Sequence, residues 1–191
     1  MEVRNIFLTG KKRSGKSTLI NNILKELNIN YSGYRTLPYY IKDEGRGFYI
    51  NGYVDCVGNY SPISIKVGEE KCIPIIDTFE IIGTSILEKS IEDKNSELIL
   101  LDEIGRLETK AEAFKAGIIK VLDSRKIVLG VLQKVDNDFL KDIKNREDTL
   151  VFDIDDLVQE EKKELYLKIV TDLRYILERW GKHYEKVQKN Y

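Results

Sequence analysis

One stretch of eight residues near the start of the chain constrains its fold more than any other feature. Residues 10–17 read Gly-Lys-Lys-Arg-Ser-Gly-Lys-Ser and match the pattern G-x-x-x-x-G-K-[ST] in full. Residues 3–9, rich in β-branched and aromatic side chains, predict a short strand before it, and residues 19–27 after it are apolar at helical spacing. This order of strand, glycine-bounded loop and helix predicts an anion-binding turn at a helix N-terminus.

The residue types within this loop suit a triphosphate. Glycines let the backbone curl so that successive N–H groups point inward and form an anion nest. We expect Lys16 to reach the β- and γ-phosphates and the hydroxyl of Ser17 to bind Mg²⁺. The predicted nucleotide-binding residues of this segment are Gly10, Lys11, Lys12, Arg13, Ser14, Gly15, Lys16, Ser17 and Thr18.

A second signal lies at residues 98–103. Four consecutive apolar residues predict a strand covered on both faces, as in a parallel sheet, and Asp102 and Glu103 follow directly. We expect Asp102 to serve the metal and Glu103 to orient or deprotonate the attacking water, because neighbouring side chains on a strand diverge. The alternative is a strand that ends in a solvated acidic turn. The complete phosphate loop favours the catalytic interpretation.

Strand and helix patterns alternate along the rest of the chain. Buried strands are predicted at residues 98–101, 127–132 and 149–152, and helices at residues 77–87, 107–122 and 138–144. Asp77 with Glu80, and Asp156 with Gln159, each fit a capping box, which predicts two helix starts. This alternation predicts an α/β fold around a mostly parallel central sheet.

Residues 34–74 show a different pattern of apolar and polar residues. Short segments alternate apolar and polar residues between glycines, which predicts antiparallel strands joined by tight turns. Residues 34–41 and 47–55 are the two arms of the predicted hairpin, around a turn at residues 42–46. We therefore expect a small antiparallel β-hairpin insertion in the otherwise parallel sheet.

The charge of the chain is nearly balanced but unevenly placed. Its 191 residues carry 31 Lys and Arg against 32 Asp and Glu. Seven basic and two acidic side chains lie in the first 35 residues, so this segment has a net charge of +5 within an otherwise acidic chain. Because the excess gathers at one loop rather than over a face, we expect a phosphate site and not a nucleic-acid surface.

Length and composition predict a single domain over residues 1–191, located in the cytoplasm. No apolar run approaches the ~18 residues of a membrane span, and the first residues do not read as a signal peptide, so no membrane association is expected. One His and two Cys, Cys56 and Cys72, argue against a His-based metal cage, a Ser-His-Asp triad and a disulfide framework.

Residues 156–191 predict one long C-terminal helix. Its apolar positions step by three or four residues, at Leu165, Ile169, Leu173, Ile176, Trp180, Tyr184 and Val187. Such a stripe is typical of a helix packed along its own domain. It also fits a helix whose end, past Trp180, contacts a protein partner or a second copy of the chain.

Residues 102–108 read Asp-Glu-Ile-Gly-Arg-Leu-Glu. Together with the loop at residues 10–17, this stretch resembles the thermophilic-type P-loop nucleoside-triphosphatase family, whose members carry an Asp-Glu-Ile-Gly-basic-hydrophobic-Glu stretch at this place. Further matches lie at residues 45–48, 114, 128–130, 143–146 and 151–152, and the resemblance covers about residues 1–175. It implies a three-layer, RecA-like α/β fold and slow, Mg²⁺-dependent hydrolysis of ATP, GTP and other nucleoside triphosphates to the diphosphate and phosphate.

The resemblance also implies that nucleotide contacts come from the phosphate loop and from Leu101, Asp102, Glu103, Ile104 and Gly105. Lys16 and Glu103 are the predicted catalytic residues, and Ser17 and Asp102 the predicted metal ligands. Either Arg106 or Arg46 is expected to neutralise charge that develops on the phosphates. Residues 133–136 and those after Glu178 depart from the family pattern, so the resemblance assigns them no role.

Three other functions fit parts of the sequence. Residues 102–105 satisfy D-x-x-G and residues 133–136, Gln-Lys-Val-Asp, nearly match the N/T-K-x-D loop that reads guanine, so a regulatory GTPase-like switch stays open. Gln in place of Asn, and a Glu directly after Asp102, fit a hydrolase better. A small-molecule kinase would share the loop and fold, with Arg35 and Arg46 near an acceptor. A nucleotide-gated module acting through the C-terminal helix is the third.

Overall fold

Two apolar runs of the sequence form the central strands of the structure. The computed structural model describes residues 3–42, 44–68 and 71–188, with the backbone alone for residues 180–188. Strand β6 (Leu98–Ile104) and strand β7 (Ile127–Leu132) pair in parallel, and their apolar residues are buried. Strand β1 (Asn5–Thr9) lies parallel to β7, and β8 (Thr149–Asp153) lies parallel to β1. The strands predicted at residues 98–101 and 127–132 are therefore present and buried, as expected. The strand predicted at residues 149–152 is present as β8, but β8 lies at the edge of the sheet with Leu150 exposed, so its predicted burial is wrong.

The antiparallel part is larger than the predicted hairpin. Strand β2 (Tyr31–Ile41) pairs with β3 (Glu44–Gly52), which pairs with β4 (Pro62–Val67), and β4 pairs with β5 (Lys71–Pro74). The first half of β2 also pairs in parallel with β6, so the antiparallel strands continue the main sheet. The sheet order is β5-β4-β3-β2-β6-β7-β1-β8.

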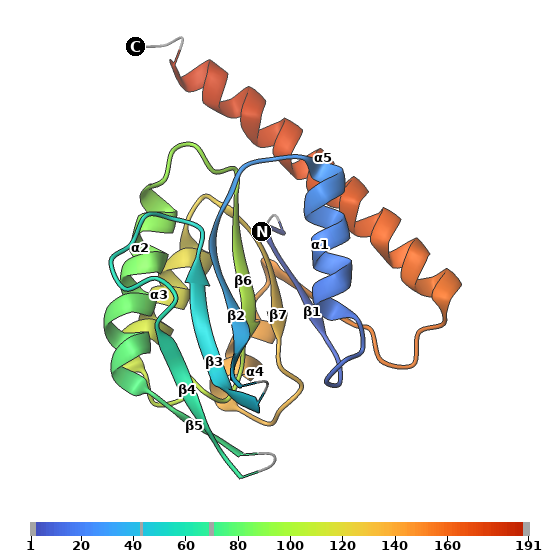
Figure 1. Cartoon of the computed structure of the whole chain (residues 1–191). Helices are drawn as coiled ribbons and strands as arrows, with labels where there is room; N and C mark the ends of the chain where they lie inside the picture. Colours follow the sequence, from blue (N-terminus) through green and yellow to red (C-terminus); the bar gives the residue numbers. More distant parts are fainter. Residues whose placement is uncertain (1–2, 43, 69–70, 189–191) are drawn as a thin grey trace.

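Helices cover both faces of this sheet (Figure 1). Helices α1 (Lys16–Leu27) and α5 (Gln159–Gln188) lie on one face. The π-helical stretch η1 (Thr78–Gly83) and helices α2 (Thr84–Glu92), α3 (Glu112–Asp123) and α4 (Asp138–Lys144) pack on the other. Three layers around a mostly parallel sheet confirm the predicted α/β class.

Alternate residues along each central strand supply two separate cores. Ile99 and Leu101 of β6 face α2 and α3, whereas Leu98 and Leu100 face α1 and α5. Each of these four side chains is fully buried. Burying both faces stiffens β6, which carries the predicted acidic pair at its end.

Both predicted capping boxes are wrong. Asp77 has helical backbone angles and makes no capping hydrogen bond, and the carboxylate of Glu80 instead accepts the N–H of Ala113, at the start of α3. Asp156 has a left-handed backbone (φ 61°), and it is Glu161 that reaches back to the N–H of Val158. In both places the fold sets backbone angles and side-chain contacts that differ from those of a capping box.

Helix α3 begins later than predicted, at Glu112, so Leu107 belongs to the turn after β6. Helix α4 and strand β7 have the predicted bounds.

Helix α5 confirms the long C-terminal helix over its described part. Ile169, Val170, Leu173 and Ile176 are buried against α1 and the sheet, and Arg174 forms an ion pair with Glu26 of α1. The side chains of Trp180, His183, Tyr184 and Val187 lie outside the described residues, so a partner contact past Trp180 stays a prediction. Among the described residues, no helix is both long and apolar enough to cross a membrane.

Candidate active site

The phosphate loop joins the end of β1 to the start of α1. Gly15, just before the helix, has a left-handed backbone (φ 99°) that side-chain-bearing residues rarely adopt. Gly10 has φ 151°, which side-chain-bearing residues also rarely adopt, and a Cβ atom there would lie 2.8 Å from a carboxylate oxygen of Asp155. Both glycines of the pattern are therefore required by the backbone path.

Lys16 is the first residue of α1 and its side chain is buried. Its ammonium group donates hydrogen bonds to the carbonyl oxygens of Gly10 (2.8 Å) and Lys11 (2.7 Å). These bonds hold the positive charge of Lys16 against the phosphate loop, next to the N-terminus of α1. A helix N-terminus stabilises an anion.

The loop is tied to the ends of two further strands. The N–H of Lys11 donates to Asp155, just after β8, at 2.6 Å. Lys134, just after β7, in turn donates to Asp155 (2.9 Å) and to Asp153 (2.6 Å). These bonds fix the start of the phosphate loop relative to the carboxyl end of the parallel sheet.

Asp102 lies near the end of β6 and is 6% exposed. Burial raises the pKa of its carboxyl group, and the neighbouring charges of Arg35 and Lys16 oppose that rise. Arg35, on β2, stands opposite Asp102 in the strand register, with Nε 3.3 Å from Oδ2. Asp102 is therefore a buried acid with a positive charge on either side.

Glu103 is half-buried and bonds to a residue of the next strand. The amide Nε2 of Gln133, the residue after β7, donates to its carboxylate at 3.1 Å. Burial raises the pKa of Glu103, while the charge of Lys16 and the Gln133 hydrogen bond lower it. The peptide bond between Asp102 and Glu103 is cis.

Glu108 is the last residue of the same segment and is buried. Its carboxylate accepts the N–H of Gly105. Burial raises the pKa of Glu108 to about 7, although that hydrogen bond acts in the opposite direction. Three carboxyl groups with raised pKa values, two buried and one half-buried, thus lie within one heptapeptide, which makes this segment a candidate functional site.

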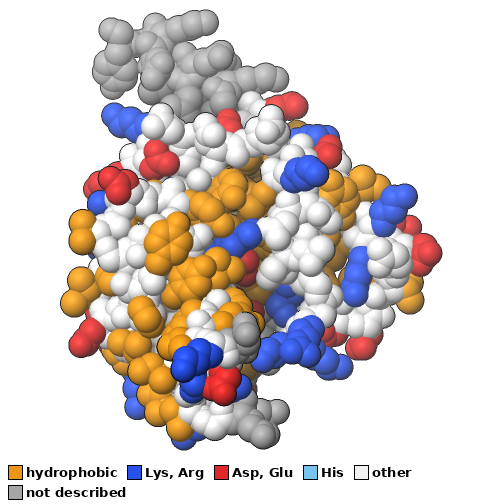
Figure 2. Space-filling model, in the orientation of Figure 1, with side chains coloured by type: hydrophobic (Ala, Val, Ile, Leu, Met, Phe, Trp, Pro, Cys, Tyr) orange, Lys and Arg blue, Asp and Glu red, His pale blue; other side chains and the backbone are white. Residues whose placement is uncertain are grey.

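Lys16, Asp102, Glu103 and Gln133 share one cleft of about 470 Å³ at the carboxyl edge of the parallel strands. Figure 2 shows a hollow on this face with basic and acidic side chains at its floor and hydrophobic ones on the side of the antiparallel strands. The predicted residues that line the cleft are Gly10, Lys12, Arg13, Ser14, Gly15, Lys16, Ser17, Thr18, Asp102, Glu103 and Arg106. The structure thus brings both predicted motifs together.

Five predicted site residues lie elsewhere among the described residues. Leu101 and Ile104 are buried in the core, and Gly105 is bound to Glu108. Lys11 takes part through its backbone N–H. Arg46 is half-exposed and forms an ion pair with Glu44 beside the tight turn between β2 and β3.

Sequence reasoning missed part of the cleft wall. Thr36, Phe48 and Cys72 line it from β2, β3 and β5, and Leu107 and Gln133 line it from the turns after β6 and β7. Cys72 and Cys56 are both free, as expected. Phe48 lies in the 45–48 segment that matched the family pattern, and that match could have indicated its place in the cleft wall.

A phosphate loop after β1 and an acidic pair on β6, with β7 between these two strands, define a P-loop nucleoside triphosphatase. The NTPase family model matches residues 5–170. The chain belongs to this family, whose members are hydrolases of nucleoside triphosphates.

Curated relatives agree with this assignment. Nucleoside-triphosphatase THEP1 of Thermotoga sp. (strain RQ2) is 31% identical over 157 residues, which cover 79% of this chain and 86% of that protein. Nucleoside-triphosphatase THEP1 of Methanothermobacter thermautotrophicus is 25% identical over 181 residues, covering 86% of this chain and 93% of that protein.

Two solved structures share the fold. The crystal structure of THEP1 from Aquifex aeolicus has a TM-score of 0.64 at 21% identity and covers 88% of this chain and 96% of its own. The solution structure of a human cancer-related nucleoside triphosphatase has a TM-score of 0.69 at 22% identity and covers 91% and 98%.

Proposed function

We propose that the chain hydrolyses ATP, GTP and other nucleoside triphosphates to the diphosphate and phosphate, slowly and with Mg²⁺. The observation that carries the proposal is the shared cleft, which is lined by Lys16 and Ser17 of the phosphate loop and by Asp102 and Glu103 of β6. The names of the curated relatives support the hydrolase over the switch, kinase and module that the sequence left open.

The phosphate loop is proposed to bind the triphosphate. Its backbone N–H groups at the start of α1, together with the Lys16 ammonium, hold the β- and γ-phosphates. Arg106 lines the cleft next to Glu103 and neutralises charge that develops on the γ-phosphate. Of the two predicted arginines it is the better candidate, because Arg46 is paired with Glu44.

The donor set in the cleft fits a magnesium ion. Ser17 offers a hydroxyl and Asp102 a carboxylate, which are the hard oxygen ligands that Mg²⁺ prefers. No group of three or more His, Cys, Asp or Glu among the described residues could hold a metal, and this fits an ion shared between protein and phosphates. When bound, Mg²⁺ would supply charge neutralisation at the β- and γ-phosphate oxygens.

Glu103 is proposed as the general base. It takes a proton from the attacking water as the water oxygen bonds to the γ-phosphorus and the bond to the β-γ bridging oxygen breaks. Half-burial raises the pKa of its carboxyl group, which makes it a better proton acceptor.

The test is phosphate release from ATP with Mg²⁺ and no acceptor. Glu103→Gln should bind nucleotide as the wild type does and lose about 10²- to 10⁴-fold in kcat. Glu112→Gln, an exposed residue of α3, is the matched control and should keep the wild-type rate. Wild-type turnover by Glu103→Gln would falsify the mechanism, and tight nucleotide binding by the wild type without any phosphate release would favour the switch.

A panel of ATP, GTP, CTP, UTP and the deoxynucleotides tests base preference. The side chain of Gln133 is bonded to Glu103, and Asp136 is paired with Lys141, so the segment that resembled a guanine reader is already engaged. We expect kcat/KM to vary by less than about tenfold across the panel. A sharp preference for guanine would restore residues 133–136 as a base reader.

A further inference from the structure

Gln133 occupies a fixed place between two parts of the cleft. It is the first residue after β7, and its backbone N–H donates to the carbonyl of Ile104 at 2.8 Å. Its own carbonyl accepts the N–H of Val135 at 3.0 Å. The backbone of Gln133 is therefore anchored to β6 on one side and to its own turn on the other.

The side-chain amide of Gln133 makes two hydrogen bonds of opposite kind. Its Oε1 accepts the backbone N–H of Arg106 at 3.1 Å, and its Nε2 donates to the carboxylate of Glu103 at 3.1 Å. A backbone N–H can only donate and an ionised carboxylate can only accept, so the reversed amide would lose both bonds. The chemistry of its two partners thus fixes the orientation of the amide.

Gly105 makes room for this arrangement. A Cβ atom at Gly105 would lie 2.6 Å from Oε1 of Gln133 and 2.9 Å from its Cβ. Any larger residue at that position would displace the Gln133 side chain. The segment after Glu103 is therefore shaped to let Gln133 lie against it.

We propose that Gln133 is a positioning residue that holds the Glu103 carboxylate in the orientation needed to take a proton from the attacking water. This proposal rests on the proposed function, because it assigns Gln133 a role through the general base. One carboxylate oxygen of Glu103 is occupied by the amide, which leaves the other for the water. A general base acts only with its acceptor oxygen within hydrogen-bond reach of the proton, and small misplacements lower the rate steeply.

The variant that tests the proposal is Gln133→Met, which keeps the length of the side chain but removes the donor and the acceptor. We expect kcat to fall about 10- to 100-fold, as for a catalytic group moved by about 1 Å. KM and the Kd for a fluorescent ATP analogue should stay within about twofold, since Gln133 does not hold the phosphates. Asp136→Asn, in the same turn but exposed and paired with Lys141, is the matched control and should leave both unchanged.

A double-mutant cycle separates positioning from general damage. If Gln133 acts through Glu103, adding Gln133→Met to Glu103→Gln lowers the residual rate by less than about twofold, because the base is already gone. Single-turnover measurements with labelled ATP reach such low rates. An equal loss in both backgrounds, a wild-type kcat for Gln133→Met, or a weakened Kd with unchanged kcat each overturns the proposal.

Two further controls separate a folding defect, and a failure of the proposed function, from a failure of the positioning role. If Gln133→Met fails to fold by circular dichroism, Gln133→Glu replaces it. When ionised, this variant accepts from Arg106 but cannot donate to Glu103, so the same loss of kcat is expected at a pH where its carboxyl group is ionised. If Glu103→Gln itself turns over at the wild-type rate, the proposed function fails. If only the Gln133 variants behave as wild type, the proposed function stands and the positioning role falls.

Discussion

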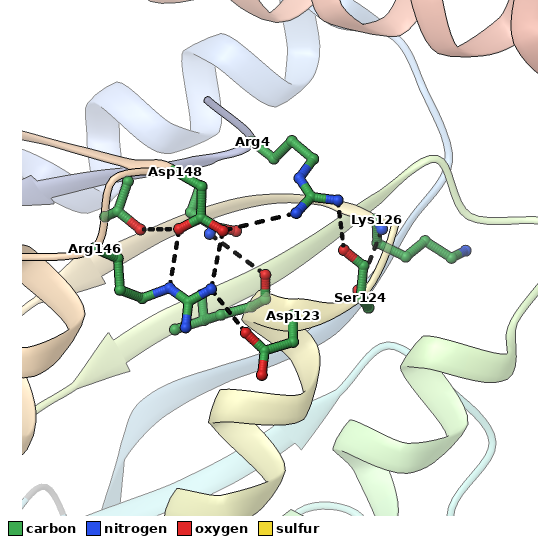
Figure 3. Close-up of polar contacts among 9 residues, drawn as sticks. Arg4, Asp123, Ser124, Lys126, Arg146 and Asp148 are labelled. Atoms are coloured by element: carbon green, nitrogen blue, oxygen red, sulfur yellow. Dashed lines mark hydrogen bonds and ion pairs between the residues drawn. The ribbon is translucent and has the colours of Figure 1, made fainter. Parts of the chain in front are cut away.

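The two ends of the parallel strands differ in how far the charges of their buried acids are compensated by partners. At the edge where the parallel strands begin, Asp148 precedes β8 and is buried, but Arg146 donates to both of its carboxylate oxygens at 2.9 Å. Arg4, before β1, lies 3.7 Å from the same carboxylate. Figure 3 shows Arg146 placed between Asp148 and Asp123. Burial raises the pKa of Asp148, but the hydrogen bonds and charge of Arg146, together with hydrogen bonds from Asn5 and Thr149, lower it overall.

At the carboxyl edge of β6 the balance is the reverse. The pKa values of Asp102, Glu103 and Glu108 are all raised, with burial as the largest cause, because their partners offset burial only in part. The charge of a fully paired acid is neutralised by its partners, whereas the under-compensated Asp102 and Glu103, which line the cleft, remain available to a substrate, a metal or a proton. Burial alone therefore does not mark the site; the incomplete pairing does.

Removing Arg146 should have the largest effect on stability. Arg146→Met removes both short hydrogen bonds to the buried Asp148 and leaves it the longer contact to Arg4 and the hydrogen bond from Thr149. Breaking a buried pair from one side costs about 3 kcal/mol. Urea unfolding measures that loss, and kcat well below the melting temperature should stay at the wild-type value. A large drop in kcat in the folded variant would mean that this edge also serves catalysis.

Glu108→Gln should reveal the strain of a buried, under-compensated acid through its pH dependence. The native pKa of about 7 lies above the unfolded value of about 4.5, so the contribution of Glu108 to stability is largest at low pH and is lost as pH rises through this window. The loss corresponds to about 3 kcal/mol, and a glutamine, neutral throughout, escapes it. The stability of the variant relative to wild type should therefore rise by about that amount between pH 4.5 and 8. Parallel stability curves over this range would show that Glu108 is paired after all.

The smallest effect is expected from Lys134→Met. Lys134 braces Asp155, which holds the N–H of Lys11, so its loss should loosen the phosphate loop slightly. We expect the Kd for ATP to rise about two- to fivefold with little change in kcat, since exposed ion pairs contribute little. Lys141→Met, an exposed lysine paired with Asp136 and Asp138, is the control and should bind ATP normally. Equal affinity in both variants would remove Lys134 from the description of the loop.

The parts of the fold that could be predicted from sequence are those with local signals. Continuous apolar runs identify β6 and β7, and the glycine pattern identifies the phosphate loop. The first half of β2 could not be found this way. Its central residue, Gly33, carries no side chain, and a Cβ there would lie 2.0 Å from the carbonyl oxygen of Leu100. Its place is set by close approach to β6, which no local pattern records.

The residues of the site likewise fall into those that a local motif identifies and those that only the fold brings there. Lys16, Asp102 and Glu103 belong to compact motifs, so sequence alone could name them, and their roles stay predictions until turnover is measured. Arg35 reaches Asp102 through the register of β2 with β6, and Gln133 lines the cleft from the turn after β7. Such contacts depend on which strands are neighbours, and a single sequence does not contain that information.

The most direct test of the contrast between the two edges measures kcat and the free energy of unfolding together, for Glu103→Gln and Asp148→Asn. We predict opposite results. Glu103→Gln should lose about 10²- to 10⁴-fold in kcat and unfold no more easily than the wild type. Asp148→Asn should keep its turnover and lose stability, because it weakens the bonds of Arg146. A Glu103→Gln variant that unfolds easily yet turns over at the wild-type rate, beside an Asp148→Asn variant that is stable, would contradict the assignment of the two edges.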